Sequence, residues 1–127
     1  ENYNDRKTGQ FIGVYERKVK DMLTPYTRPQ SNGNREEVRW TTITNNGKGL
    51  EFVADKPMSV TAIPYTEKEL FETDHHYKLP VSHRTVLHLD AGVTGLGGAS
   101  CGQGGPLPQD RVTAAPTRFG LLIRPVK

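Results

Sequence analysis

The stretch EVRWTTITNNGKGLEFVA, residues 37–54, decides the fold class of this chain. Side chains on both sides of Asn46-Gly47 alternate in character with the two-residue period of a β-strand. Asn-Gly tolerates the positive φ angles of a tight turn, so the stretch predicts a β-hairpin. Trp40 is expected to face the interior from the first strand of this hairpin, and Phe52 from the second.

Three further segments have strand patterns, namely 58–65, 84–91 and 117–124. Lys56-Pro57 is expected to separate the first of them from the hairpin, and Pro64 to end it at a sheet edge. The strand faces expected to be apolar are those of Leu50, Phe52 and Ala54 and of Phe119, Leu121 and Ile123. Short strands divided by turn signals predict an all-β fold, an antiparallel β-sandwich.

One short helix is predicted near residues 67–73. Thr66 and Glu69 have the spacing of a capping box, in which each side chain binds the backbone N–H of the other residue. Leu70 and Phe71 follow directly and are expected to attach the helix to the sheet. The helix is therefore a minor element of a β-fold.

Length and charge exclude several classes of protein. The 127 residues fit one domain, 1–127, with one hydrophobic core. No apolar run approaches the roughly 20 residues of a membrane-spanning helix, so no membrane partner is expected. The net charge of +3 comes from scattered Lys and Arg residues, whereas nucleic-acid binding requires a one-signed stripe. The single cysteine, Cys101, excludes an intrachain disulfide.

Short motifs in the chain fail their context tests. Gly98-Ala99-Ser100-Cys101-Gly102 matches the G-x-S-x-G of serine hydrolases. That motif needs a following helix and a later His, and this chain has no His beyond His88. The four histidines lack metal-ligand spacing. We therefore predict no catalytic and no metal-binding residues in this chain.

Several longer motifs follow one another along the chain. They are Glu1-Asn2-Tyr3-x-Asp5-Arg6, Pro29-Gln30-x-Asn32-Gly33-Asn34-Arg35, Val38-Arg39-Trp40, His88-x-Asp90 and Gly95-x-Gly97-Gly98. This series resembles the C-terminal domain, or small chain, of the large bacterial β-galactosidases of glycoside hydrolase family two. The resemblance implies a supersandwich of the galactose mutarotase-like type. It also implies that residues 1–127 are the C-terminal part of a larger domain.

The resemblance implies retaining hydrolysis of terminal β-D-galactosides by two glutamates of a barrel domain that this chain lacks. The chain alone is therefore expected to be inactive and without a cofactor, while Mg²⁺ and a monovalent cation are implied for the barrel domain. The implied partners are the remaining domains of the same β-galactosidase, galactosides and further copies in a homo-oligomer. The compartment, cytoplasmic or periplasmic, stays open.

The glycine-rich loop 95–105 is the part that the resemblance places at the leaving-group side of the sugar. Gly97, Gly98, Ser100 and Cys101 are its predicted substrate-binding residues. Members of the family have G-G-x-x-S-W here, and Cys101 stands about where their Trp offers a ring to the sugar. A pocket-lining role and a buried structural role for Cys101 both stay open.

The segment from Pro29 to Arg35 is predicted to be a structural turn rather than a sugar contact, because Asn-Gly-Asn favours positive φ angles. Two alternative functions stay open beside the enzyme domain. One is a free-standing carbohydrate-binding module, which a set of exposed aromatic side chains would favour. The other is a purely structural domain that braces an enzyme and its oligomer.

Overall fold

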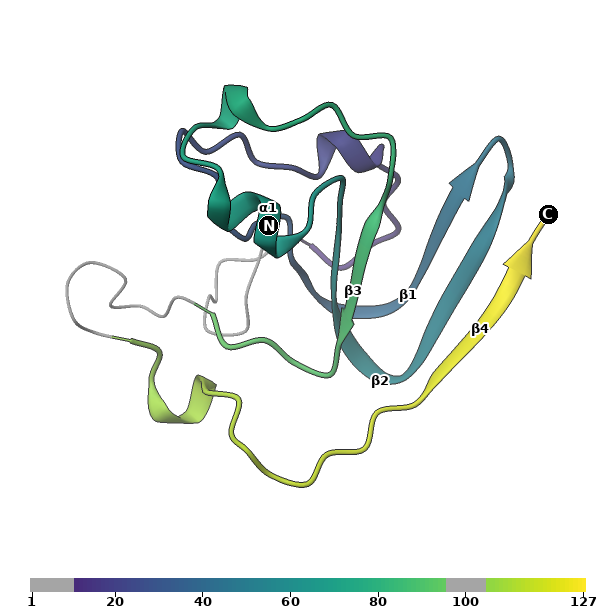
Figure 1. The fold of residues 1–127 in the computed structure, drawn as a ribbon. Helices are drawn as coiled ribbons and strands as arrows, with labels where there is room; N and C mark the ends of the chain where they lie inside the picture. Colours follow the sequence, from purple (N-terminus) through teal and green to yellow (C-terminus); the bar gives the residue numbers. More distant parts are fainter. Residues whose placement is uncertain (1–10, 96–104) are drawn as a thin grey trace.

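The computed structural model describes residues 11–95 and 105–127. One antiparallel sheet dominates it, with strands β1 (Arg35–Asn45), β2 (Lys48–Ile63), β3 (Val86–Asp90) and β4 (Leu121–Val126) (Figure 1). The helical elements are α1 (Glu67–Glu72) and three 3₁₀ turns, η1 (Val19–Asp21), η2 (His76–Lys78) and η3 (Pro108–Asp110). The predicted all-β class with one short helix is confirmed, and the arrangement is that of a sandwich-like domain.

Strand β2 is the centre of the sheet. It pairs with β1 along one edge. Along its other edge it pairs with β3 through Ser59–Ile63 and with β4 through Gly49–Ala54. β3 and β4 pair with different stretches of the same edge of β2. Segments far apart in sequence therefore meet on one central strand.

The prediction that Lys56-Pro57 separates two strands is wrong, because β2 runs through it. Trp40 pairs with Val53 and Val38 with Met58, so four residues of β2 lie opposite a single residue of β1. This irregular stretch accommodates Pro57, whose missing N–H breaks no regular pairing with β1 there. The strand therefore bends where the sequence indicates a break.

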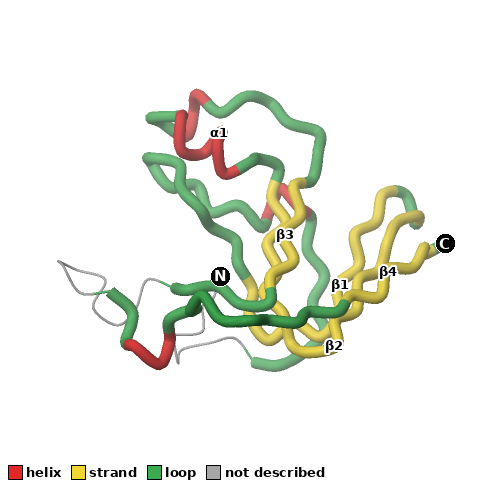
Figure 2. Tube along the Cα trace, turned by 60° about the horizontal axis from the view of Figure 1, so that its bottom comes forward, coloured by secondary structure: helices red, strands yellow, loops and turns green. Residues whose placement is uncertain are grey.

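The bend divides the sheet into two parts, which Figures 1 and 2 show from different sides. We call residues 40–54 and 121–126 the wing; it holds the hairpin tip and β4. The other part holds β3, α1 and the second half of β2. It contains five of the six buried hydrophobic residues among the described residues, which are Met58, Val60, Ala62, Ile63 and Leu70. The sixth, Phe52, is in the wing.

The last strand begins later than predicted, at Leu121 instead of residue 117. β2 and the chain that leads into β4 first meet at Asp55, whose N–H donates to the carbonyl of Gly120 at 3.0 Å. In an antiparallel ladder, this bond means that the backbone N–H and C=O groups of every second residue of β4 point toward β2. The backbone nitrogen of Pro125 therefore points away from β2. An edge strand tolerates proline at such a position.

The capping box of α1 is confirmed. The Glu69 N–H donates to Thr66 Oγ1 at 3.2 Å, and the Thr66 N–H donates to Glu69 Oε2 at 2.8 Å. Leu70 is buried as expected, but Phe71 is 81% exposed, so its predicted role in attaching the helix is wrong. One residue further along a helix turns a side chain by about 100°, which carries Phe71 off the buried side.

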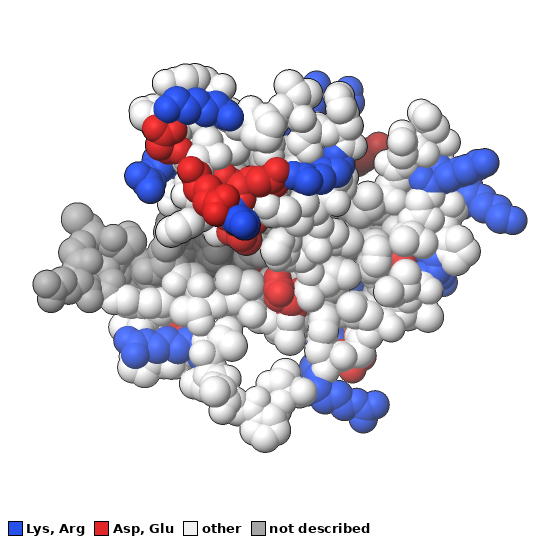
Figure 3. All heavy atoms as spheres, in the orientation of Figure 1, with Lys and Arg blue, Asp and Glu red and all other residues white. Residues whose placement is uncertain are grey.

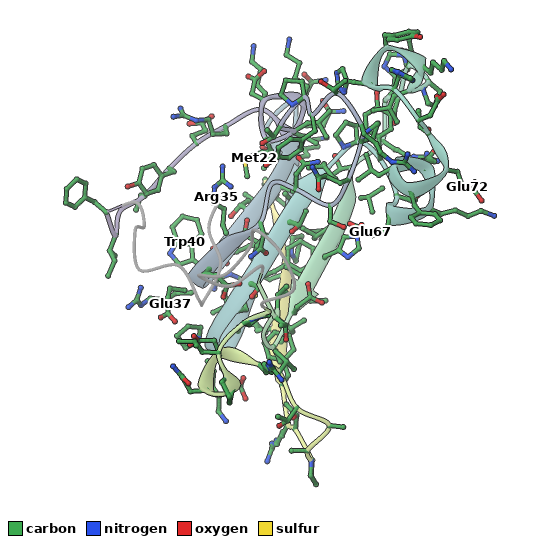
Figure 4. The ribbon with its side chains drawn as sticks, turned by 90° about the vertical axis from the view of Figure 1, so that its left-hand side faces the viewer. Met22, Arg35, Glu37, Trp40, Glu67 and Glu72 are labelled. Atoms are coloured by element: carbon green, nitrogen blue, oxygen red, sulfur yellow. The ribbon has the colours of Figure 1, made fainter. Side chains whose placement is uncertain are left out.

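Trp40 is 47% exposed, so the expected inward orientation is also wrong. Figure 4 shows it projecting from β1 on the side of the molecule opposite α1.

No helix within the described ranges 11–95 and 105–127 is long and apolar enough to cross a membrane.

Candidate functional site

The four predicted substrate-binding residues, Gly97, Gly98, Ser100 and Cys101, lie outside the described residues. The structure describes both ends of the loop that carries them. The loop leaves β3 through residues 91–95 and returns through 105–112, which contain the turn η3.

A hydrogen bond between described residues joins the two ends of this loop. The Val112 N–H donates to Thr94 Oγ1 at 2.8 Å, across eighteen residues of sequence. The Val112 side chain also lies against Gly92, 3.7 Å from where a Cβ on that glycine would stand. Arg111 Nε donates to the Pro106 carbonyl at 2.9 Å and closes the returning arm on itself. These contacts anchor the two ends of the loop to each other just after β3 ends.

The segment from Pro29 to Arg35 makes a turn, as predicted, while its predicted lack of sugar contact stays a prediction. Gly33 has a φ of +80°, and the flanking Asn32 and Asn34 are buried. Asn32 Oδ1 accepts from the Thr24 N–H at 2.8 Å, and its amide nitrogen donates to the Gln30 carbonyl at 2.7 Å. The Asn32 amide thus holds two backbone segments in place.

A polar network continues from this turn into the sheet. Asn34 Nδ2 and Ser59 Oγ both donate to Glu36 Oε1, at 2.8 and 2.6 Å. Thr61 Oγ1 lies 3.3 Å from Asn34 Oδ1 and donates to it. Buried polar groups are stable only when they are paired in this way. Sequence reasoning missed Glu36 and Ser59 because no local signal links residues 23 positions apart.

A shallow groove of about 600 Å³ lies between the loop 28–31 and α1. It is lined by Arg28, Pro29, Gln30, Ser31, Glu67, Lys68, Leu70 and Phe71. Ser31 Oγ donates to Glu67 Oε2, which joins the two walls; Figure 4 shows Glu67 and Glu72 on the α1 side, away from Trp40. A groove that combines apolar atoms, polar side chains and the exposed ring of Phe71 can bind a small polar molecule.

Acidic side chains gather over α1 with basic ones beside them (Figure 3). Hydrogen bonds from Thr66, and then the Arg84 guanidinium, lower the pKa of Glu69. The Lys78 ammonium, 2.8 Å from Asp74 Oδ2, lowers the pKa of Asp74 to about 2. Such groups stay ionised near neutral pH and do not suit acid–base catalysis there. Within residues 11–95 and 105–127, no group of three His, Cys, Asp or Glu residues can hold a metal ion.

The described residues thus provide the two joined ends of a glycine-rich loop on an antiparallel sheet and, between residues 28–31 and α1, a groove. The family model described as "Beta galactosidase small chain" matches residues 1–123, so the chain belongs to the β-galactosidase small-chain family. A β-galactosidase of Priestia megaterium is 42% identical over 99 residues, which cover 77% of this chain and 10% of that protein.

Two further relatives extend this comparison. A β-galactosidase of Halalkalibacterium halodurans is 40% identical over 100 residues, covering 77% of this chain and 10% of that protein. A β-galactosidase small subunit of Latilactobacillus sakei is 38% identical over 111 residues, covering 77% of this chain and 34% of that subunit. The chain therefore spans a tenth to a third of the length of these relatives.

Proposed function

We propose that this chain is the small-chain domain of an enzyme that hydrolyses terminal β-D-galactosides with retention of configuration. The observation that carries the proposal is the family match over residues 1–123. Relatives named β-galactosidase, at 42% and 40% identity, support it. In this proposal the two catalytic carboxylates belong to polypeptide outside this chain, because no residue of the chain is assigned to that pair.

The domain's proposed role is to brace the catalytic barrel and the oligomer. The Latilactobacillus sakei relative is named a small subunit, which supports partnership with a large subunit or with other domains of the same enzyme. Mg²⁺ and a monovalent cation, implied by the family resemblance, are assigned to the catalytic domain. Galactosides are its substrates in this proposal.

The loop 95–105 is proposed to reach the leaving-group side of the sugar site. The hydrogen bond from the Val112 N–H to Thr94 Oγ1 supports this, because it joins the two described ends from which the loop extends. Gly97 and Gly98 allow close approach of the backbone, while Ser100 and Cys101 supply the side chains. Cys101 has no ring, so weak stacking on a glucose leaving group is expected.

The test uses a chimera in which this chain replaces the matching segment of the Priestia megaterium β-galactosidase. We expect the chimera to hydrolyse chromogenic galactosides and the chain alone not to. In the chimera, Cys101→Trp should raise kcat/KM for lactose relative to an aryl galactoside about fivefold, as about 1 kcal/mol of stacking gives.

Cys101→Leu is the matched control, since it adds apolar volume without a ring. A correctly folded Cys101→Trp chimera with an unchanged ratio would place the loop away from the sugar. An inactive chimera that is folded and assembled would contradict the proposed function itself.

A carbohydrate-binding module is the second candidate. The groove beside α1 supports it, because it combines the exposed ring of Phe71 with the polar side chains of Arg28, Gln30 and Glu67. A glycan-binding assay on the chain, repeated with Phe71→Ala, separates the two functions. Binding that this substitution abolishes would favour the module.

A further inference from the structure

The chain contains the dipeptide Asn-Gly twice, at Asn46-Gly47 and at Asn32-Gly33. An asparagine that precedes glycine can lose its side-chain amide without an enzyme, because the next backbone nitrogen attacks the amide carbon and glycine has no Cβ to hinder the approach. Asparagine is accordingly among the labile residues that heat-adapted proteins use sparingly. The two dipeptides share this chemistry, so the structure around each one decides how readily it reacts.

Asn46 lies at the tip of the hairpin, where little restrains it. Asn45 pairs with Lys48 across a two-residue turn, and residues 44–48 are all exposed. The hydrogen bond of such a turn joins its first and fourth residues, so the Gly47 N–H takes no part in it. No other described residue holds the Asn46 side chain by a hydrogen bond. Figures 1 and 2 show the tip away from α1 and beside the end of β4, so opening the tip disturbs little else.

Asn32 is held far more firmly. It is 3% exposed, its Oδ1 accepts from the Thr24 N–H at 2.8 Å, and its Nδ2 donates to the Gln30 carbonyl at 2.7 Å. The backbone beside it is also closely packed, since a Cβ on Gly33 would stand 2.9 Å from the Met22 carbonyl oxygen. Before the Gly33 nitrogen can reach Asn32 Cγ, both hydrogen bonds have to break and the turn has to leave its place. The reaction at Asn32 therefore requires extensive unfolding.

We propose that Asn46 is a site of spontaneous deamidation and that the fold protects Asn32 from the same reaction. The Gly47 nitrogen loses its proton and bonds to Asn46 Cγ, the Cγ–Nδ2 bond breaks, and Nδ2 leaves with that proton as ammonia. Water then opens the cyclic imide and leaves aspartate or isoaspartate at position 46. Water is consumed and ammonia released, so the reaction needs no oxidant, reductant or further reactant.

The two products differ in their effect on the hairpin. Aspartate adds a negative charge near Lys48 and near Lys127, which follows the Val126 that pairs with Gly49. Exposed charge pairs contribute little to stability, so this product leaves the hairpin intact. Isoaspartate carries the main chain through the side-chain carbon and so lengthens the turn by one backbone atom. That product disturbs the pairing of Asn45 with Lys48 and loosens the tip.

Peptide mapping by mass spectrometry measures both positions in one sample. The full 127-residue chain is incubated in mildly alkaline buffer, in which the attacking backbone nitrogen loses its proton more readily. Deamidation raises the mass of a peptide by about 1 Da, and chromatography separates the aspartate and isoaspartate forms. In the folded chain we expect Asn46 to react about tenfold or more faster than Asn32, because a hairpin tip opens far more often than a buried turn.

The matched control is the same chain in guanidinium chloride. Unfolding removes the protection of Asn32, so both asparagines should then react at similar rates, since each precedes a glycine. Leu70→Ala is a second control, because it removes a buried side chain outside both dipeptides and favours global unfolding. In this variant we expect the reaction at Asn32 to accelerate by about tenfold or more and the reaction at Asn46 to change little.

Equal rates at Asn46 and Asn32 in the folded chain would overturn the proposal, and so would an Asn46 that reacts only in guanidinium chloride. Equal acceleration of both positions by Leu70→Ala would also overturn it, by showing that the tip opens only when the whole chain unfolds. Should the isolated chain fail to fold, the same two peptides are compared in the Priestia megaterium chimera, with the same ratio expected. The measurement does not use enzyme activity, so its outcome is independent of the proposed function.

Discussion

Gly33 is the position at which a single added methyl group should be most informative. Its φ of +80° is in the left-handed region, which costs a residue with a Cβ about 1–2 kcal/mol. A Cβ at this position would also stand 2.9 Å from the Met22 carbonyl oxygen and 3.0 Å from Ile63 Cγ2. The carbonyl belongs to the backbone and cannot rotate away, so crowding adds about 1–3 kcal/mol. Gly33→Ala should therefore lower the free energy of unfolding by about 2–5 kcal/mol.

Gly47→Ala is the matched control. Gly47 has a φ of +78°, nearly that of Gly33, but a Cβ there would meet no atom within 4 Å. Only the backbone strain of about 1–2 kcal/mol applies to this substitution. The difference between the two variants, about 1–3 kcal/mol, isolates the contact with Met22 and Ile63.

Urea unfolding of the full chain measures both variants. Trp40 is the single tryptophan and reports through its fluorescence. Equal slopes of the unfolding free energy against urea would show that the unfolded states are comparable. Equal losses of stability for Gly33→Ala and Gly47→Ala would refute the reasoning, because the close contact would then contribute nothing.

Two further predictions concern α1 and the segment after it. Leu70→Ala should lower the free energy of unfolding by about 2–5 kcal/mol, because Leu70 is buried, while Phe71→Ala should change it by less than about 0.5 kcal/mol; similar losses would contradict this. Asp74, with a pKa lowered to about 2 by Lys78, stabilises the fold above the unfolded pKa of about 4. This contribution should disappear as pH falls from 4 to 2, so thermal melts of wild type and Asp74→Asn should converge there, and a constant difference in melting temperature would contradict it.

Local chemistry made several parts of the fold predictable. Asn46 and Gly47 have φ values of 51° and 78°, and that preference belongs to the dipeptide itself, so the hairpin followed from the sequence. The capping box of Thr66 and Glu69 and the turn at Gly33 are equally local. The family assignment also came from the sequence, since its motifs are contiguous stretches of chain.

Side-chain environments were less predictable, because they depend on distant segments. Phe71 and Trp40 are large and apolar, which favours burial in any local reading. Both are exposed, since the described chain packs no segment over them. Of the candidate site, the anchor between Thr94 and Val112 had no sequence signal, because the bond spans the glycine-rich loop. The predicted sugar-contacting residues of that loop stay a prediction.

The sequence by itself determined the hairpin at Asn46-Gly47, the turn at Gly33, the single short helix and the family. Only the tertiary structure decided that β2 continues through Pro57 and that β4 pairs with its first half. It also decided that Leu50 and Ile123, more than seventy residues apart, share one apolar face. The physical reason is that a β-ladder forms between backbones, whose hydrogen-bonding groups are nearly the same in every residue. Periodicity can therefore tell which residues share a face of one strand, while the choice of neighbouring strand depends on how the whole chain packs.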